Sequence, residues 1–148
     1  MSKEFRLVIP KTKLDFQKYY FLRWSILREP WGQQIGTEID EFEDNAYHIM
    51  GINSNKKVLA VGRIHNISNN SAQIRYMAVL EKYEKSGFGT KILNSLETYA
   101  VNNSISRIVL NSRESAIDFY IKNGYKKIKQ VNTLFNEINH WFMEKEIN

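Results

Sequence analysis

The chain has 148 residues, a formal net charge of +5 at pH 7 and no cysteine. This length suits a single domain, residues 1–148, that is long enough to bury a core. The lack of cysteine excludes disulfides, thiolate zinc sites and a cysteine nucleophile. The start of the chain lacks the apolar run of a signal peptide, and no segment approaches the roughly 20 apolar residues that span a bilayer. We therefore expect a cytoplasmic protein with no membrane segment.

The excess of basic residues raises the question of nucleic-acid binding. The basic side chains are scattered, and the one dense cluster, Lys126, Lys127 and Lys129, alternates around Ile128 on an expected strand. Such alternation is typical of a solvated face or a protected sheet edge. A basic balance also suits a ligand that carries several phosphate charges. Nucleic-acid binding is therefore an alternative that we do not favour.

The N-terminal half of the chain combines strand and helix patterns. Apolar alternation predicts strands at residues 5–9, 46–52 and 57–65. Apolar and aromatic positions predict a helix over residues 14–27, which ends before Pro30 because a residue that precedes proline disfavours the helical conformation. Residues 31–36 are expected to form a loop, and the acidic residues 37–45 a short second helix.

The C-terminal half continues with strands and helices in alternation. Residues 73–80 are rich in β-branched and aromatic side chains and predict a strand. Phe88, Ile92, Leu96 and Tyr99 or Ala100 then recur at helical spacing and predict an amphipathic helix. Three further strands are expected at residues 107–111, 125–131 and 140–146. A short helix is expected at residues 115–124, where a glycine ends it.

Two glycines stand where the strand at residues 73–80 gives way to the helix. A helix that begins there has unpaired N–H groups and a partial positive charge, and Gly87 and Gly89 let the backbone approach a bulky anion. The P-loop pattern fails because Thr90 and Lys91 follow Gly89 instead of Lys and Ser/Thr. The dinucleotide fingerprint fails because Ile92 stands where it needs a third glycine.

The segment Tyr-Glu-Lys-Ser-Gly-Phe-Gly-Thr, residues 83–90, resembles the acyl-CoA loop of the GNAT superfamily of N-acetyltransferases, Gln/Arg-x-x-Gly-x-Gly/Ala. A second block supports the resemblance: Ala116, Phe119, Tyr120, Gly124 and Tyr125 match the GNAT pattern Ala-x-x-Phe-Tyr-x-x-x-Gly-Phe/Tyr. Both blocks occur in the family's order and at suitable spacing. The resemblance is strong over residues 74–125.

The resemblance implies an α/β (α+β) fold, the GNAT acyl-CoA N-acyltransferase fold, with a mixed, mostly antiparallel sheet of about seven strands and helices on both faces. It implies direct transfer of an acetyl group from acetyl-CoA to a primary amine of a small molecule or peptide, without a metal. Because GNAT proteins commonly pair, it also implies a homodimer. The alternative function is a non-catalytic module that binds acyl-CoA or nucleic acid.

The resemblance also assigns residues to the donor. The main chain of Met77, Ala78 and Val79 would pair with the pantetheine arm, and Val79 would polarise the thioester carbonyl. The diphosphate would be held by main-chain N–H groups of Lys85, Ser86, Gly87, Phe88, Gly89 and Thr90. Asn111 and Arg113 would contact the pantetheine arm, and Tyr120 would protonate the leaving sulfur. One departure is Glu84, which occupies the Gln/Arg position of the loop and is expected to point to solvent.

The general base is not identified by the resemblance, because Gln73 stands where some GNAT branches carry a glutamate. His65 and His140 are candidates, since each is expected beside the cleft and has an unperturbed pKa near 6.5. His48, in the middle of a strand, is a weaker candidate. A water-mediated route, or an amine that arrives neutral, needs no histidine.

Acceptor recognition is expected from the segment between the first helix and the second strand, which usually covers the acceptor pocket in GNAT proteins. Trp31, Glu38 and Asp40 lie in this segment, and its carboxylates contrast with the basic remainder of the chain. We therefore hypothesise a cationic acceptor, attracted by these carboxylates and stacked on Trp24 or Trp31. The competing explanation is an acidic, solvated helix start.

Overall fold

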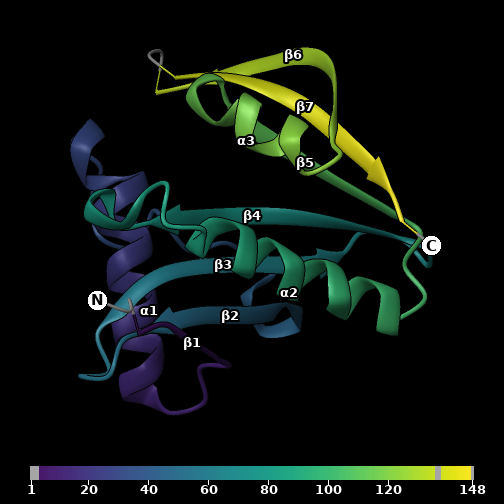
Figure 1. Cartoon of the computed structure of the whole chain (residues 1–148). Coiled ribbons are helices and arrows are strands. Elements are labelled where there is room, and N and C mark those ends of the chain that lie inside the picture. Colours follow the sequence, from purple (N-terminus) through teal and green to yellow (C-terminus); the bar gives the residue numbers. More distant parts are fainter. Residues whose placement is uncertain (1–3, 136–137, 148) are drawn as a thin grey trace.

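Seven strands form one mixed sheet in the computed structural model, which describes residues 4–135 and 138–147. The strands are β1 (Arg6–Val8), β2 (Tyr47–Ile52), β3 (Val58–Asn66), β4 (Ser71–Val79), β5 (Arg107–Arg113), β6 (Lys126–Leu134) and β7 (Ile138–Glu146). The helices are α1 (Lys13–Leu27), α2 (Phe88–Asn102) and α3 (Ile117–Lys122), with short 3₁₀ turns η1 (Glu29–Trp31), η2 (Glu43–Asn45), η3 (Glu81–Tyr83) and η4 (Glu114–Ala116). These elements follow the predicted order (Figure 1).

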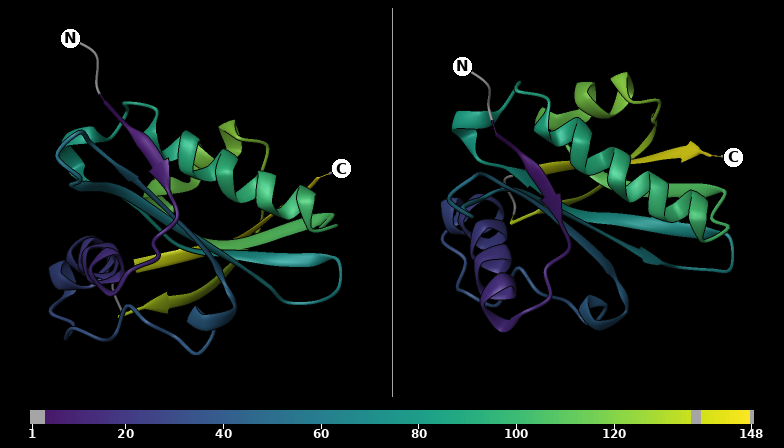
Figure 2. Two further views of the ribbon diagram at one scale, coloured as in Figure 1. Left: turned by 90° about the horizontal axis from the view of Figure 1, so that it is seen from below. Right: turned by 60° about the horizontal axis from the view of Figure 1, so that its bottom comes forward.

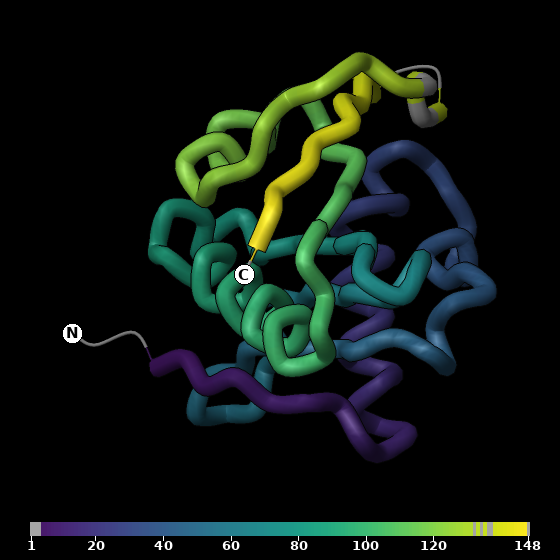
Figure 3. The backbone as a smooth tube through the Cα atoms, turned by 90° about the vertical axis from the view of Figure 1, so that its right-hand side faces the viewer, coloured from purple at the N-terminus to yellow at the C-terminus, as the bar shows by residue number. Residues whose placement is uncertain are grey.

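The strands are arranged in the order β1-β2-β3-β4-β5-β7-β6. Only β4 and β5 run parallel, and the other neighbouring pairs described are antiparallel. Figure 3 shows β1 at one edge and the strand pair β6–β7 at the other. Lys126, Lys127 and Lys129 are exposed on the edge strand β6, as their alternation predicts.

Helices cover both faces of the sheet, which confirms the predicted layering (Figure 2). On one face, α2 buries Phe88, Ile92, Leu96 and Ala100, the stripe that the sequence predicts. Gly62 of β3 allows this close packing, because a Cβ there would lie 2.6 Å from the Cγ2 of Ile92. On the other face, α1 packs against β3 and β4.

The helix α1 begins and ends at recognisable signals. Thr12 and Asp15 form a capping box, in which each side chain accepts a main-chain N–H of the other residue. The helix stops at Leu27, three residues before Pro30. Tyr19 and Leu22 are buried on the side that faces the sheet. No helix in the described part of the chain is both long and apolar enough to cross a bilayer.

The prediction of a helix over residues 37–45 is wrong apart from the one turn η2. In this segment acidic side chains replace helical hydrogen bonding. The Glu38 carboxylate accepts the N–H of Gly36, Asp40 accepts that of Phe42, and Glu43 accepts that of Asp40. Short polar side chains compete with helix formation in this way. The segment therefore folds as turns whose carboxylates point inward.

Candidate active site

The sheet opens between β4 and β5, and this opening forms a cavity. The two parallel strands pair from Ser71 and Arg107 as far as Ile74 and Leu110, and then diverge (Figure 1). A cavity of about 400 Å³ lies where they part. Its walls come from β4 and β5, from α3, from the end of α1 and from the strand pair β6–β7. Segments from the whole length of the chain thus meet at one point.

A β-bulge deforms β4 at the cavity. The register of β4 against β3 slips by one residue, so that Tyr76 and Met77 together face Gly62. Tyr76 has a φ of 60°, which is uncommon for a bulky residue. Bulges bend a strand and redirect its side chains, and they are frequent beside active sites. This bulge helps β4 to turn away from β5.

Beyond the bulge, β4 presents main-chain groups to the opening. The N–H of Leu80 donates to the carbonyl of Leu59 in β3 at 2.9 Å. Successive N–H groups of an extended chain point to opposite edges. The N–H of Val79 therefore points away from β3, toward the edge from which β5 has departed. An extended ligand could pair with this edge as an added strand does.

The helix α2 begins with no side-chain cap. Gly87 is its N-cap residue, with a φ of 89°, and the first helical bond runs from the N–H of Lys91 to the carbonyl of Gly87. The N–H groups of Phe88, Gly89 and Thr90 therefore precede the first intrahelical bond. The helix α1 has a capping box, whereas α2, like the short helix α3, has no side-chain cap. Such an end binds anions.

The side chains of the loop leave its main chain accessible. Lys85 and Gly87 both have positive φ and are exposed, and a Cβ on Gly87 would meet nothing within 4 Å. The Ser86 hydroxyl donates to a carbonyl within the loop. The ring of Phe88 turns inward and stacks on Phe5, with 3.9 Å between ring centroids. Glu84 is exposed, as expected, which confirms its orientation.

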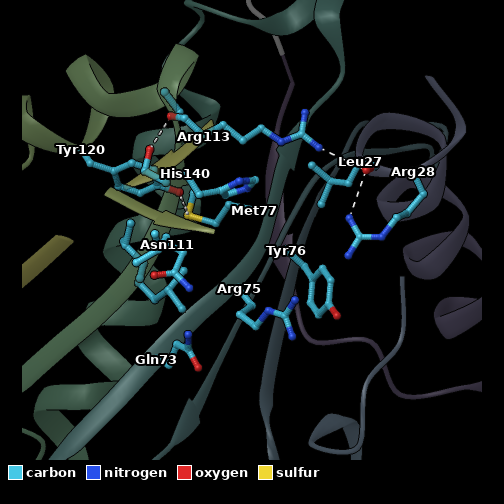
Figure 4. A pocket seen from close by; sticks show the side chains of 15 residues that line it. Leu27, Arg28, Gln73, Arg75, Tyr76, Met77, Asn111, Arg113, Tyr120 and His140 are labelled. Carbon is cyan, nitrogen blue, oxygen red and sulfur yellow. Dashed lines mark hydrogen bonds between the residues drawn. The ribbon is translucent and has the colours of Figure 1, made fainter. Parts of the chain in front are cut away.

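Tyr120 presents its hydroxyl to the cavity from α3. The side chain is 7% exposed, and the hydroxyl donates to the Sδ of Met77 at 3.4 Å (Figure 4). A thioether sulfur is a weak acceptor, so this hydroxyl is available to a better one. Burial raises the pKa of Tyr120. The oxygen therefore keeps its proton across the neutral range.

His140 lines the same cavity from β7. Its Nδ1 lies 3.1 Å from the carbonyl of Ile138, a geometry in which Nδ1–H donates and Nε2 is left as the acceptor. Burial lowers the pKa of His140, and the charges of Arg113, Arg28 and Arg75 lower it further. The imidazole is therefore neutral near pH 7 and able to accept a proton.

Asn111 and Arg113 reach the cavity from the end of β5. Asn111 is exposed at the opening. Arg113 spans the cavity, and its Nη2 donates to the carbonyl of Leu27 at the end of α1, at 3.1 Å (Figure 4). The guanidinium therefore lies at α1, although the main chain of Arg113 belongs to β5.

Comparison with known proteins identifies the family. The model of the Acetyltransferase (GNAT) family matches residues 15–125. The chain belongs to the GNAT family. It is therefore an acyltransferase, and the predicted family and fold are confirmed. The uncharacterized N-acetyltransferase YjcF of Bacillus subtilis (strain 168) is 26% identical over 141 residues, which cover 95% of this chain and 99% of YjcF.

Two solved structures share the GNAT fold with this chain. An aminoglycoside 6′-N-acetyltransferase complexed with coenzyme A is 14% identical, with a TM-score of 0.80 and 97% of each chain covered. A GNAT family acetyltransferase from Elizabethkingia anophelis with acetyl-CoA bound is 13% identical, with a TM-score of 0.75, and the match covers 99% of this chain and 100% of that one. At these identities the likeness shows the fold alone.

The other two histidines of this GNAT protein lie outside the residues that line the cavity. His65 is buried beside Arg63, whose Nη2 lies 3.0 Å from its Nδ1, and its ring stacks on Phe42. His48 lies between the hydroxyl of Tyr19 at 2.8 Å and a main-chain carbonyl. Among residues 4–135 and 138–147, no group of three or more His, Asp and Glu is placed to hold a metal ion.

The predicted acceptor residues Trp31, Glu38 and Asp40 also lie outside the cavity lining. Glu38 is buried, and its carboxylate accepts a main-chain N–H. Asp40 binds Arg63 with both carboxylate oxygens, at 2.6 and 3.0 Å, and pairs with Arg75 at 2.8 Å. These carboxylates are engaged inside the protein.

Arg28, Arg75 and Tyr76 are among the residues of the cavity wall that the sequence did not indicate. Arg28 and Arg75 come from the end of α1 and from β4, and the guanidinium of Arg75 lies 4.4 Å from the centre of the Tyr76 ring. Single arginines in separate elements carry no local pattern. The one signal in the sequence concerns Arg75, which shares a face of the predicted strand at residues 73–80 with the polar Gln73.

We predict that Asp40→Asn destabilises the fold. Arg63 is fully buried and would lose its bidentate partner, while it keeps Glu43 at 2.8 Å. Loss of one partner of a buried ion pair costs about 3 kcal/mol, measurable by urea unfolding. The matched control is Glu144→Gln, which removes the more exposed pair with Arg107 and should cost about 1 kcal/mol or less. Equal losses in the two variants would contradict the structural role of Asp40.

The same variant has a pH signature. Burial alone raises the pKa of Asp40, but hydrogen bonds from Arg63 and from the N–H of Phe42, with the charges of Arg63 and Arg75, hold it at about 2. A depressed carboxyl pKa stabilises the fold above the unfolded pKa near 4, and this contribution is lost as the pH falls toward 2. The stability difference between the wild type and Asp40→Asn should therefore shrink over that interval.

Proposed function

We propose that this GNAT protein transfers the acetyl group of acetyl-CoA to a primary amine of a small molecule or peptide by direct transfer. One observation carries the proposal: the open edge of β4 lines a cavity with a buried tyrosine and a neutral histidine, and it leads along the strand to Val79, which lies beside Gly89 at the uncapped N-terminus of α2. Acetyl-CoA has a phosphate end, an extended arm and a reactive thioester, and these parts match the three features.

The loop before α2 fits the diphosphate of acetyl-CoA. The N–H groups of Phe88, Gly89 and Thr90 have no intrahelical partner, and the space over Gly87 is open. Of the predicted main-chain donors from Lys85 through Thr90, the N–H of Ser86 donates to the carbonyl of Tyr83 at 3.2 Å, and the others would donate to the phosphate oxygens. The helix dipole favours the negative charge. Because the side chain of Glu84 is exposed to solvent, it does not cover the main-chain N–H groups of this loop.

The edge of β4 fits the pantetheine arm. Main-chain groups of Met77, Ala78 and Val79 would pair with its amides as an added strand, and Asn111 and Arg113 flank the opening from β5. The N–H of Val79 points to this edge and would donate to the thioester carbonyl. Such a fixed donor stabilises the negative charge that develops on the carbonyl oxygen during transfer.

Tyr120 and His140 would move the protons. Attack by the amine on the thioester carbonyl forms the amide and breaks the carbon–sulfur bond, so the amine loses a proton and the sulfur gains one. Tyr120 holds its proton beside Met77 and would donate it to the sulfur. His140 is neutral and would accept the proton of the amine. His65 does not line the cavity but lies opposite Gln73, which does, in the β3–β4 pair, and it is the second candidate base.

Other expectations from the sequence stay predictions. They are a single domain over residues 1–148, a cytoplasmic location, a homodimer, the absence of a metal, and no role for nucleic acid. The direct test of the function is the release of free thiol from acetyl-CoA in the presence of a diverse panel of amines, with the products identified by mass spectrometry. Binding of acetyl-CoA without thiol release would favour a non-catalytic binding module.

We predict that Thr90→Glu weakens acetyl-CoA binding without loss of stability. Thr90 is the third residue of α2, where a carboxylate stabilises the helix but repels a bound diphosphate. The dissociation constant measured by calorimetry should rise on the order of tenfold, while the melting temperature stays the same or rises. Thr90→Gln is the neutral control of equal size. If the two variants bind acetyl-CoA equally, the diphosphate does not lie at this helix end.

We predict that Tyr120→Phe lowers kcat at neutral pH on the order of 10²-fold, with little change in KM for acetyl-CoA, because general acid catalysis contributes at least that factor. Steady-state kinetics with thiol detection measures the effect. Tyr125→Phe is the control, since Tyr125 is also buried but donates to Glu97 outside the cavity. An unchanged kcat in Tyr120→Phe rules out the general-acid role.

We predict that kcat/KM falls at acidic pH with a midpoint below 6.5 if His140 is the base. The pKa of His140 is lowered, so the neutral form persists to a lower pH and is lost as the pH falls through that value. His140→Gln should remove this titration and lower kcat/KM on the order of 10²-fold. His65→Gln tests the second candidate in parallel. Retention of the titration in His140→Gln would assign the base elsewhere.

A further inference from the structure

The lining of the cavity is rich in basic side chains. Among the described residues that line it, Arg28, Arg75, Arg113 and His140 are basic, and none is an aspartate or glutamate. Arg75 is neutralised by Asp40 at 2.8 Å. In the described part of the chain, Arg28 and Arg113 have no carboxylate within ion-pair distance. Two guanidinium groups of the wall therefore have no carboxylate partner among residues 4–135 and 138–147.

Arg28 and Arg113 meet at the C-terminal end of α1. The Nη1 of Arg28 and the Nη2 of Arg113 both donate to the carbonyl of Leu27, each at 3.1 Å. Figure 4 shows Arg113 reaching across from the side of Tyr120 to the side of Arg28. A helix C-terminus carries a partial negative charge, which attracts cations. This attraction explains how the positively charged side chains of Arg28 and Arg113 can lie close together.

Most donors of this arginine pair are still available. Arg28 also donates its Nε to the carbonyl of Thr37 at 3.0 Å, so the pair makes three hydrogen bonds to described residues. Each guanidinium has five N–H donors. None of the nitrogens of Arg28 or Arg113 is both fully buried and without a partner, so the remaining donors are open to a ligand. A planar fork of this kind matches a carboxylate.

The environment of the pair favours an anion. Burial lowers the pKa of Arg113, and the charge of Arg28 lowers it further. Burial also lowers the pKa of Arg28. Both effects express the cost of holding two positive charges in a partly desolvated place. A bound anion would offset that cost, and a cationic ligand would increase it.

The arginine pair lies apart from the expected position of the donor phosphates. The anion-binding end of α2 and the C-terminal end of α1 lie on opposite faces of the sheet (Figure 2). A diphosphate at Gly87 would therefore approach from one face, and Arg28 is left to a molecule that enters from the other face. In this position the molecule would reach the thioester from the side of α1.

We propose that Arg28 and Arg113 bind a carboxylate of the acceptor, so that the acceptor is an amine with an anionic group, such as a free amino acid. This deepens the proposed function and rests on it, since it assigns the second substrate of the same cavity. It also replaces the cationic acceptor expected from Glu38 and Asp40, because those carboxylates are engaged inside the protein.

The test compares amino acids with their amides, for example phenylalanine with phenylalaninamide, as acceptors of acetyl-CoA. The wild type should prefer the free carboxylates by about tenfold or more in kcat/KM. In Arg28→Gln this preference should fall by about tenfold to hundredfold, mainly through KM, the factor expected for a charge-assisted hydrogen bond. Because the test uses the ratio of kcat/KM for the free amino acid to kcat/KM for its amide, a general loss of activity in a variant cancels.

Three further variants make the comparison specific. Arg28→Lys keeps the charge but loses the planar fork, and an intermediate preference is expected. Arg113→Gln should reduce the preference in the same direction as Arg28→Gln. Arg107→Gln removes the same charge at a site that pairs with Glu144, outside the cavity, and should keep the wild-type ratio. Circular dichroism confirms that each variant is folded.

Three results would overturn the proposal. The first is a preference for the amides in the wild type, and the second is a preference for carboxylates that Arg28→Gln leaves unchanged. The third is a preference for succinyl-CoA over acetyl-CoA that is lost in Arg28→Gln, because the pair would then bind a carboxylate of the acyl group and not of the acceptor.

A binding measurement separates this proposal from the transferase function. N-acetylphenylalanine and its amide are titrated by calorimetry into the wild type and Arg28→Gln in the presence of CoA. If no amine releases thiol, but the wild type binds the carboxylate at least tenfold more tightly than Arg28→Gln does, the anion site stands and the transferase function fails. If thiol is released but both proteins bind the carboxylate equally, the transferase function stands and the arginine assignment fails.

Discussion

The end of hydrogen bonding between β4 and β5 is the constraint on which the rest of the site depends. Pairing stops after Ile74 and Leu110, and the bulge at Tyr76 turns β4 away. Strand edges inside a protein carry N–H and C=O groups that are costly to leave unpaired. An opening of this kind is retained where a ligand can supply the missing partner. The same divergence makes room for the cavity and lets Tyr120 reach Met77 from α3.

The strained bulge is held by a cluster of charged groups on the α1 face. The guanidiniums of Arg23 and Arg75 lie 4.2 and 4.4 Å from the centre of the Tyr76 ring. Arg23 is paired with Glu43 at 2.9 Å, and Asp40 pairs with Arg75. A positive φ at a bulky residue persists only when its surroundings fix it. The carboxylates of the loop after α1 therefore act on the active site through the arginines and the bulge.

Much of the fold could be predicted because it follows from local patterns. The stripe of α2 from Phe88 to Ala100, the strand before it and the glycine loop are each encoded within a few residues, and the two GNAT motifs gave the position of Tyr120. The helix expected over residues 37–45 does not form because its carboxylates accept nearby main-chain N–H groups. Asp40 and Glu43 also pair with arginines distant in sequence, a tertiary effect that local propensity does not contain. The meeting of Arg28 with Arg113, 85 positions apart, likewise depends on how the sheet folds, and no spacing in the sequence indicates it.

Hydrogen–deuterium exchange with and without CoA tests the central claim most directly, namely that the β4 edge and the start of α2 bind the donor through main-chain N–H groups. These amides have no intrahelical or interstrand partner in the described structure, so they should exchange rapidly in the free protein. The account predicts that saturating CoA slows exchange at Val79 and at residues 88–90, and leaves the edge strands β1 and β6 unchanged. Unaltered exchange at these amides, with CoA bound elsewhere on the folded protein, would contradict it.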